Sequence, residues 1–265
     1  ARSLHNLGDL CEVQGRYIEA ESFYQRALAL AEKTLGPSHP DVASNLNDLA
    51  WLYRKRGQFP EAEPLFQRAI AIYEQATSKS DAEGLAGSLN NLAELYMIEG
   101  KYTAAEPLLH RSLALMQTTL GAEHPHMGLT LGNLARLYHD QGKYDDAEEL
   151  YGRALTILTK AEGENHPDVA INLNNLGKLH HARGRYVSAE LLYLRAQAIW
   201  ERAFGPDHPF VAASLNNLGA LLRKQGRHAE AEPLLRRALA IDEKTLGPAH
   251  PDLATDLNNL ALLYS

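Results

Sequence analysis

Leucine and asparagine recur along the chain with a fixed period. The tetrapeptide Leu89-Asn90-Asn91-Leu92 has close copies at 46–49, 173–176, 215–218 and 257–260, and weaker copies at 4–7 and 131–134. The last leucine of each copy falls at 7, 49, 92, 134, 176, 218 and 260, a step of 42 residues with one step of 43. A period of this length predicts a solenoid, in which each unit packs only on its neighbours.

Apolar residues within each unit follow helical spacing. After His208-Pro209, Leu215, Leu218 and Leu222 form one stripe that ends at Gly226, and a second amphipathic segment runs from about His228 to Gly247-Pro248. We therefore predict an all-α chain of six helix pairs and a seventh first helix. The expected units are about 1–42, 43–85, 86–127, 128–169, 170–211 and 212–253, with a partial unit at 254–265. We expect them to form a single array, as part of a longer protein.

Glycine and small residues mark the predicted turns and close helix contacts. The turn glycines are followed two residues later by an aromatic residue or histidine, and they fall at 15, 57, 100, 142, 184 and 226. Glycine there supplies the positive φ of a helix C-cap. Alanine or glycine recurs after the second leucine of the tetrapeptide, and alanine recurs in the second helix. These are packing positions.

This pattern resembles that of the tetratricopeptide repeat family in all six full units. The 42-residue form, with segments such as Glu-Ala-Glu-Pro-Leu and Gly-Pro-x-His-Pro, is similar to that of kinesin light chains and their relatives. The resemblance implies a right-handed α-solenoid superhelix of tandem helix pairs. It is much less specific for function.

The junction at 77–84 departs from the pattern. It replaces the Gly-Pro-x-His-Pro loop and carries the extra residue of the longer step. Without the proline, we expect the following first helix to lack its fixed start. A mobile loop, a local change of superhelical angle and a neutral length variation are all consistent with the sequence.

The first helix of each unit has two faces. When the recurring leucine is numbered position 7, positions 4, 7, 8 and 11 lie on one side and are apolar or small almost throughout. Positions 2, 5, 6, 9, 12 and 13 lie on the other side, which we call the groove face because stacked first helices would form a groove there. The asparagines occupy positions 5 and 6. We assign them to the groove face and not to the core.

The asparagines allow two interpretations. Each offers two donors and an acceptor, so a ladder of them can pair with the backbone of an extended peptide. The resemblance implies the same use, since this face of tetratricopeptide proteins commonly binds peptides and kinesin light chains bind acidic, tryptophan-containing segments. Alternatively, each asparagine bonds the neighbouring repeat and sets the stacking angle. We expect the ladder to be interrupted at His5, Asp48 and Gly132 and unbroken from Asn174 to Asn259.

The other groove-face residues are more basic than the chain as a whole. Seven basic residues stand against five acidic ones, a net charge of +2 in a chain of net charge -7, and from Arg136 onward the ratio is four to one. This inversion favours an acidic ligand in the C-terminal half, with Trp51 and Met97 as apolar contacts nearer the front, although solvated charges could give it by chance. The predicted peptide-binding residues are Asn6, Asn47, Trp51, Arg54, Asn90, Asn91, Asn133, Arg136, Asn174, Asn175, Lys178, His181, Asn216, Asn217, Arg223, Lys224, Asn258 and Asn259.

Composition excludes several classes of function. The acidic balance argues against a nucleic-acid-binding surface, and no apolar run is long enough to span a membrane. Cys11 is the only cysteine, which suits a reducing compartment, so we expect a cytoplasmic protein. The histidines before proline suit a loop and cap role, and His139 and His181 lack a third ligand for zinc. We find no catalytic signature and predict no enzyme, cofactor or metal.

We therefore predict a protein- or peptide-binding scaffold. One alternative is the regulatory or sensor arm of a larger multidomain enzyme or signalling ATPase. Another is self-assembly as a homo-oligomer, because Leu257, Leu260, Leu263 and Tyr264 of the last helix lack the second helix of their unit.

Overall fold

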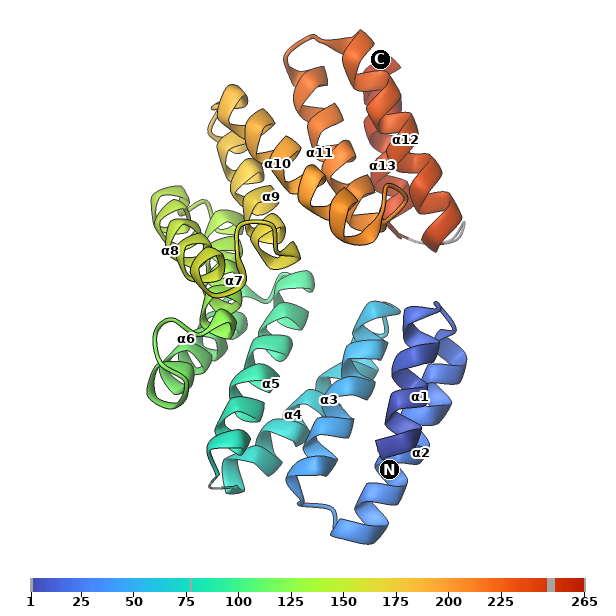
Figure 1. Ribbon diagram of the computed structural model, residues 1–265, viewed down its shortest axis with the longest axis vertical. Coiled ribbons are helices and arrows are strands. Elements are labelled where there is room, and N and C mark those ends of the chain that lie inside the picture. The colour runs from blue at the N-terminus through green and yellow to red at the C-terminus, as the bar shows by residue number, and fades with distance from the viewer. Residues whose placement is uncertain (1, 77, 247–250, 265) are drawn as a thin grey trace. The chain divides into compact units, whose positions relative to one another are not determined.

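The computed structural model describes residues 2–76, 78–246 and 251–264, and every regular element in these ranges is an α-helix (Figure 1). This confirms the predicted all-α solenoid of tandem helix pairs. The helices are α1 (Arg2–Val13), α2 (Tyr17–Leu35), α3 (Pro40–Lys55), α4 (Phe59–Gln75), α5 (Lys79–Ile98), α6 (Tyr102–Thr119), α7 (Pro125–Asp140), α8 (Tyr144–Glu162), α9 (Pro167–Ala182), α10 (Tyr186–Phe204), α11 (Pro209–Lys224), α12 (His228–Leu246) and α13 (Pro251–Tyr264).

The loop histidines cap the first helices, as the sequence indicated. In α3, α9 and α11 the helix begins at proline, and the preceding histidine accepts a hydrogen bond from the backbone N–H two residues further on. Nδ1 of His39, His166 and His208 is the acceptor, at 3.1, 3.3 and 3.2 Å. The turn glycines before the second helices have φ of 72 to 78°, the left-handed conformation expected of a helix C-cap.

The irregular junction has its own helix start, so the expectation that α5 lacks a fixed start is wrong. The Ser78 hydroxyl accepts the Asp81 backbone N–H at 3.1 Å, and the Asp81 carboxylate accepts the Ser78 backbone N–H at 3.0 Å. This reciprocal capping box replaces the proline. Thr77, within this junction, lies outside the described residues.

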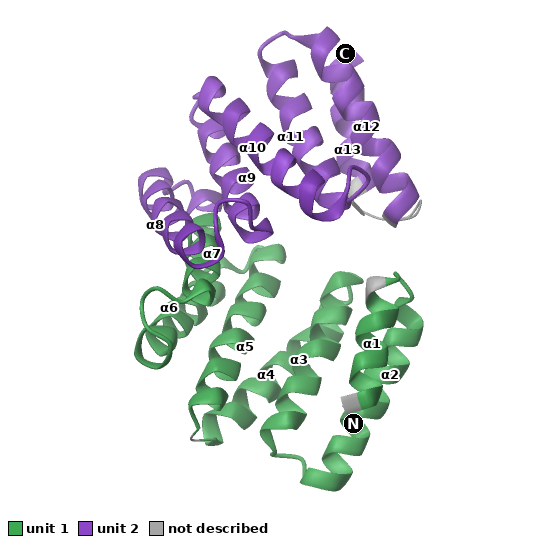
Figure 2. Ribbon diagram, in the orientation of Figure 1, with its two compact units in different colours: residues 1–137 green, residues 138–265 purple. Residues whose placement is uncertain are grey.

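The chain divides into two compact units, residues 1–137 and 138–265 (Figure 2). In unit 1, α3 packs on α2, α4 and α5, and α5 packs on α6. In unit 2, α9 packs on α8, α10 and α11, and α11 packs on α12 and α13. Each unit has its own core: Leu46, Phe66 and Leu89 are fully buried in unit 1, and Tyr193, Leu221 and Ala231 are buried in unit 2.

The two helices of a repeat meet where position 8 is small. A Cβ built on Gly8 would lie 2.5 Å from the Tyr24 ring, and one built on Gly177 would lie 2.6 Å from the Tyr193 ring. Such distances are far below van der Waals contact, so each tyrosine fills the space that a side chain would need. The same interaction recurs in α11, where a Cβ on Gly219 would lie 2.6 Å from Leu235.

We predict that Gly177→Ala lowers the free energy of unfolding by about 1–3 kcal/mol, because the added methyl group displaces the buried Tyr193 ring. The matched control is Gly152→Ala in α8, where a Cβ meets nothing within 4 Å. That change should raise stability by up to about 1 kcal/mol through helix propensity. Urea unfolding of both variants measures the difference, and equal effects would contradict the packing argument.

Candidate functional site

Three asparagine pairs link successive first helices. The donor is the position 6 amide of one repeat, and the acceptor is the position 5 carbonyl of the repeat before it. Asn133 Nδ2 lies 3.0 Å from Asn90 Oδ1, Asn217 Nδ2 lies 3.0 Å from Asn174 Oδ1, and Asn259 Nδ2 lies 2.6 Å from Asn216 Oδ1. The ladder from Asn174 to Asn259 therefore joins neighbouring repeats within unit 2.

Position 5 also donates forward. Asn47 Nδ2 lies 2.6 Å from Ser88 Oγ, and Asn216 Nδ2 lies 2.7 Å from the Asp256 carboxylate, both at position 3 of the following repeat. Asn174 and Asn216 are only 6% and 9% exposed. These two side chains do not face away from the packed interior, contrary to the expectation for the groove face. They lie between repeats, where buried amides need the partners they have.

The joint between the first two repeats has a histidine and an aspartate in place of an asparagine pair. His5 Nδ1 lies 3.4 Å from an Asp48 carboxylate oxygen, and His5 and Asp48 occupy the same positions 5 and 6 as the asparagine pairs. The asparagine ladder is replaced here, as expected, but a side-chain contact still joins the two repeats. Gly132 has no side chain and can supply no position 5 acceptor.

The remaining predicted asparagines lie on the first helices with differing exposure. Asn91 and Asn175 are half-buried, whereas Asn6 and Asn258 are exposed. The contacts observed in the ladder join successive first helices, and so they contribute to the stacking of repeats. Binding of a ligand by any asparagine stays a prediction.

Two groove-face cations of unit 1, Arg54 and Lys55, are already engaged. Arg54 pairs with Glu94 at 2.9 Å, with both side chains mostly buried, and Lys55 Nζ pairs with Glu12 at 3.1 Å. Lys55 also lies 4.4 Å above the Trp51 ring, a cation–π contact. Met97 is only 5% exposed, and its sulfur contacts Arg136 Nη2 at 3.9 Å, so Met97 offers little surface to a ligand.

In unit 2 the structure brings five basic groups together, which we call the basic row: His139, Lys178, His181, Arg223 and Lys224. Burial lowers the pKa of His139, and the charge of Lys178 lowers it further against the opposing effect of Asp140. Burial also lowers the pKa of His181, helped by Lys224 and Arg223. Lys178 and Lys224 are exposed. The row follows the C-terminal ends of α7, α9 and α11, where cations also interact favourably with helix dipoles.

His180 is not part of the basic row, and its side chain packs against α8. Its Nε2 lies 3.4 Å from a Glu148 carboxylate oxygen, and burial lowers its pKa. His139 and His181 contact the rings of Tyr144 and Tyr186, with centroid distances of 5.7 and 5.9 Å. Each of these two histidines therefore packs beside the first tyrosine of the second helix that follows it.

An acidic cluster in unit 1 was not identified from the sequence. The Tyr24 hydroxyl contacts the carboxylates of Asp9 and Glu12 at 2.8 and 3.0 Å. Burial, with the charges of Asp9 and Glu12, raises the pKa of Asp48 to about 6 despite the opposing charge of His5. The signal was present at positions 6, 9 and 12 of the first two repeats, but helix-wheel reasoning does not show that side chains from two repeats converge.

The exposed end of α13 is less open than expected. Leu263 packs against the core of unit 2, and the Tyr264 hydroxyl contacts Glu232 at 2.7 Å. Leu257 is 54% exposed. Self-assembly through this helix stays a prediction. Among the described residues, none of the helices combines the length and apolar character needed to cross a bilayer.

These features define a helical repeat protein whose first helices present a polar face. Models of the tetratricopeptide repeat match residues 1–75, 84–160, 127–202, 168–244 and 211–265, and a second such model matches 47–115. The chain belongs to the tetratricopeptide repeat family.

Solved structures with a similar fold include relatives of kinesin light chain type. BtubC (BKLC) from P. vanneervenii is 27% identical, with a TM-score of 0.67 over 89% of this chain and 93% of that one. A Podosopora anserina protein assigned as a kinesin light chain, with nearly identical TPR-like repeats, is 29% identical, with a TM-score of 0.59 over 79% and 99% of the two chains. Apo RapI shares the fold alone, at 14% identity and a TM-score of 0.66 over 99% and 96% of the chains.

A shorter match connects the repeat to a much larger protein. A segment of 44 residues is 48% identical to part of a nucleotide-binding leucine-rich repeat (NLR)-like protein from Hyaloscypha variabilis. The match spans 17% of this chain and 4% of that relative, so it shows kinship of one repeat and not of the whole protein.

We predict that Asn174 and Asn217 are energetically coupled through repeat stacking. Asn174→Ala should cost about 1–2 kcal/mol of stability because it leaves the half-buried Asn217 amide without its acceptor. A double-mutant cycle with Asn217→Ala should give a coupling of about 0.5 kcal/mol or more. The control is exposed Asn258→Ala, expected within about 0.5 kcal/mol of the parent. Additive effects in urea unfolding would refute the coupling.

We predict that Asp48→Asn stabilises the protein above pH 6. A carboxyl whose pKa is raised on folding stabilises the folded protein only while it is protonated. This contribution is lost as pH rises through the pKa of the folded state, here about 6. Because the Asp48 side chain is 38% exposed, solvent screening limits the gain to about 1 kcal/mol. The gain in melting temperature should be present at pH 8 and absent near pH 4. A pH-independent gain would point to packing instead of charge.

Proposed function

We propose that this chain is a scaffold that binds an extended acidic protein segment along the basic row of unit 2. Tetratricopeptide repeats generally serve as protein-interaction scaffolds, so binding of a protein is the general expectation. The acidic character of the segment and its place on the row are the specific parts of the proposal.

The observation that carries the proposal is the nearness of basic side chains near the C-terminal ends of three successive first helices. Lys178 is close enough to lower the pKa of His139, and Lys224 and Arg223 are close enough to lower that of His181, although burial is the larger cause for both histidines. An acidic segment would supply negative charge that favours the protonated form of both histidines. Exposed Lys178 and Lys224 would make the first contact by electrostatic steering.

Unit 1 would contribute less to such binding. Its groove-face cations Arg54 and Lys55 are paired with Glu94 and Glu12, and its first two repeats gather carboxylates near Tyr24. An acidic ligand would have to displace those pairs.

A second candidate function is that of a regulatory or sensor arm in a larger protein. The 44-residue match to an NLR-like protein of which it covers 4% shows that a repeat of this kind occurs within a long chain. In that setting the basic row would contact another domain of the same protein. The sequence of the full-length gene product distinguishes this function from that of an independent scaffold.

We predict that Lys178→Ala with Lys224→Ala weakens binding of a glutamate-rich peptide by roughly two- to thirtyfold, since partly exposed charge pairs contribute about 0.2–1 kcal/mol each. The matched control is Lys244→Ala on α12, a lysine that is also exposed but lies outside the basic row. Fluorescence anisotropy measures affinity, which should fall as salt rises. Salt-independent binding would refute the electrostatic part.

We also predict that binding of this peptide takes up protons. Nearby carboxylates would raise the lowered pKa values of His139 and His181, so affinity should increase as pH falls through the ordinary range of histidine, until the peptide itself is protonated. Isothermal titration calorimetry in buffers of different ionisation enthalpy measures the uptake. Proton release on binding would contradict this assignment.

A further inference from the structure

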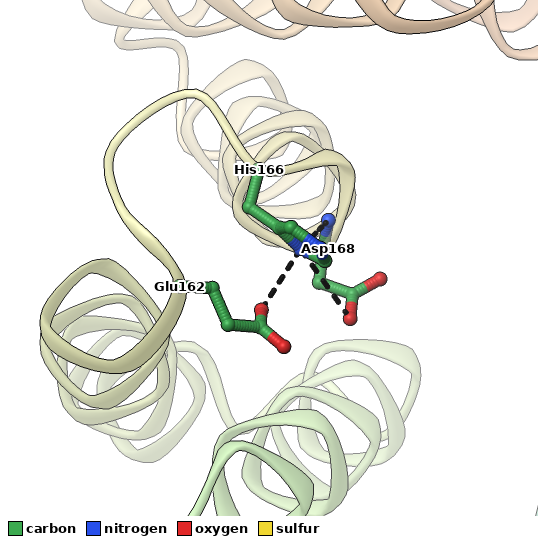
Figure 3. A group of neighbouring side chains, drawn as sticks. All are labelled: Glu162, His166 and Asp168. Carbon is green, nitrogen blue, oxygen red and sulfur yellow. Dashed lines mark hydrogen bonds and ion pairs between the residues drawn. The ribbon is translucent and has the colours of Figure 1, made fainter.

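The loop between α8 and α9 brings together two carboxylates and an imidazole. Glu162 is the last residue of α8, His166 caps α9, and Asp168 lies in the first turn of α9 (Figure 3). One ligand atom from each residue lies within 4.8 Å of the others. All three side chains are partly buried, with exposures of 20, 40 and 26%.

The distances from His166 fit donors around a common metal ion. His166 Nδ1 lies 2.9 Å from a Glu162 oxygen and 3.7 Å from an Asp168 oxygen. Nitrogen and oxygen ligands bind zinc at about 2.0–2.2 Å. Two such ligands are about 2.9 Å apart when their bonds to the ion meet at a right angle, and about 3.7 Å apart at a wide angle. Both separations are therefore compatible with one shared ion.

Glu162 is also exceptional among the repeats. The equivalent residue, four before the loop histidine, is Leu35, Leu120 or Phe204 in the other described loops. In the next repeat, Phe204 stacks on His208 with a centroid distance of 4.4 Å, so an apolar residue there packs on the capping histidine. A carboxylate at the end of a helix is disfavoured by the helix dipole. Glu162 thus places a carboxylate where the other described loops have an apolar side chain.

His166 Nδ1 lies between two groups of the cluster. The Asp168 backbone N–H donates to it at 3.3 Å, a long capping bond, and a Glu162 carboxylate oxygen lies 2.9 Å from it. A metal ion at this place would attract the imidazole nitrogen and both carboxylates, with the long capping bond given up to the metal bond.

We propose that Glu162, His166 and Asp168 form a binding site for a divalent first-row transition-metal ion, of which Zn²⁺ is the probe. The two carboxylates balance the charge of the ion, and the imidazole favours zinc-like ions over Mg²⁺ and Ca²⁺, which prefer oxygen ligands. Bound metal ties the C-terminal end of α8 to the start of α9. It thereby stabilises the contact between two successive repeats of unit 2, away from the basic row.

Titration of the chelator-treated 265-residue chain with Zn²⁺ by calorimetry tests the site. We expect a saturable site whose affinity for Zn²⁺ falls about tenfold or more in Glu162→Leu. Leucine is the residue at this place in two of the other described loops. His166→Asn should have the same effect while keeping the helix cap, because asparagine is a good N-cap residue. The matched control is His208→Asn in the next loop, which should bind Zn²⁺ like the parent.

Thermal unfolding provides an independent readout. Zn²⁺ should raise the melting temperature of the parent and of His208→Asn, and should leave that of Glu162→Leu and His166→Asn unchanged. The proposal is overturned if the parent has no saturable site, or if Glu162→Leu binds Zn²⁺ as tightly as the parent, which would assign binding to others of the 12 histidines. A third outcome also overturns the proposal: the difference in melting temperature between the parent and Glu162→Leu changes with pH but not with Zn²⁺. In that case a proton bound within the cluster, and not a metal ion, would stabilise it.

Discussion

The contact between position 8 of the first helix and the large residue facing it from the second helix is the constraint on which the rest of the structure depends. Tyr24 and Tyr193 lie where a side chain on Gly8 or Gly177 would otherwise be, and both rings are buried. Because interiors are close-packed, this contact fixes the distance between the two helices of a repeat. That distance in turn fixes where the next first helix lies, and so which residues of positions 5 and 6 meet across the repeats.

The same contact joins packing to charge. The Tyr24 ring fills the space beside Gly8, and its hydroxyl reaches Asp9 and Glu12. In the next repeat the equivalent residue is Phe66, which is fully buried and has no hydroxyl to contact carboxylates. Choice of the ring at one core position therefore changes the electrostatics of the groove face without changing the fold.

The regular part of the fold could be predicted from the sequence because its signals are local and repeated. Helix caps at His39, His166 and His208 and the turn glycines each depend on a few adjacent residues. The start of α5 is equally local, since Ser78 and Asp81 have the spacing of a capping box, although the expectation from the missing proline was that this helix has no fixed start. The site was predicted less well. A helix wheel places Asn174 and Asn216 on a polar face, but only the neighbouring helix determines that they are buried, and the convergence of Lys178, His181 and Lys224 likewise depends on stacking.

The pairing of positions 5 and 6 has a consequence for how such arrays change by duplication or loss of repeats. A repeat that carries asparagine at both positions can stand beside any other such repeat, because each joint uses one amide donor and one amide acceptor. The joint between the first two repeats is different, because His5 there contacts Asp48 in place of two amides. The asparagine joints are thus interchangeable connectors, whereas the histidine–aspartate joint marks a particular order of repeats.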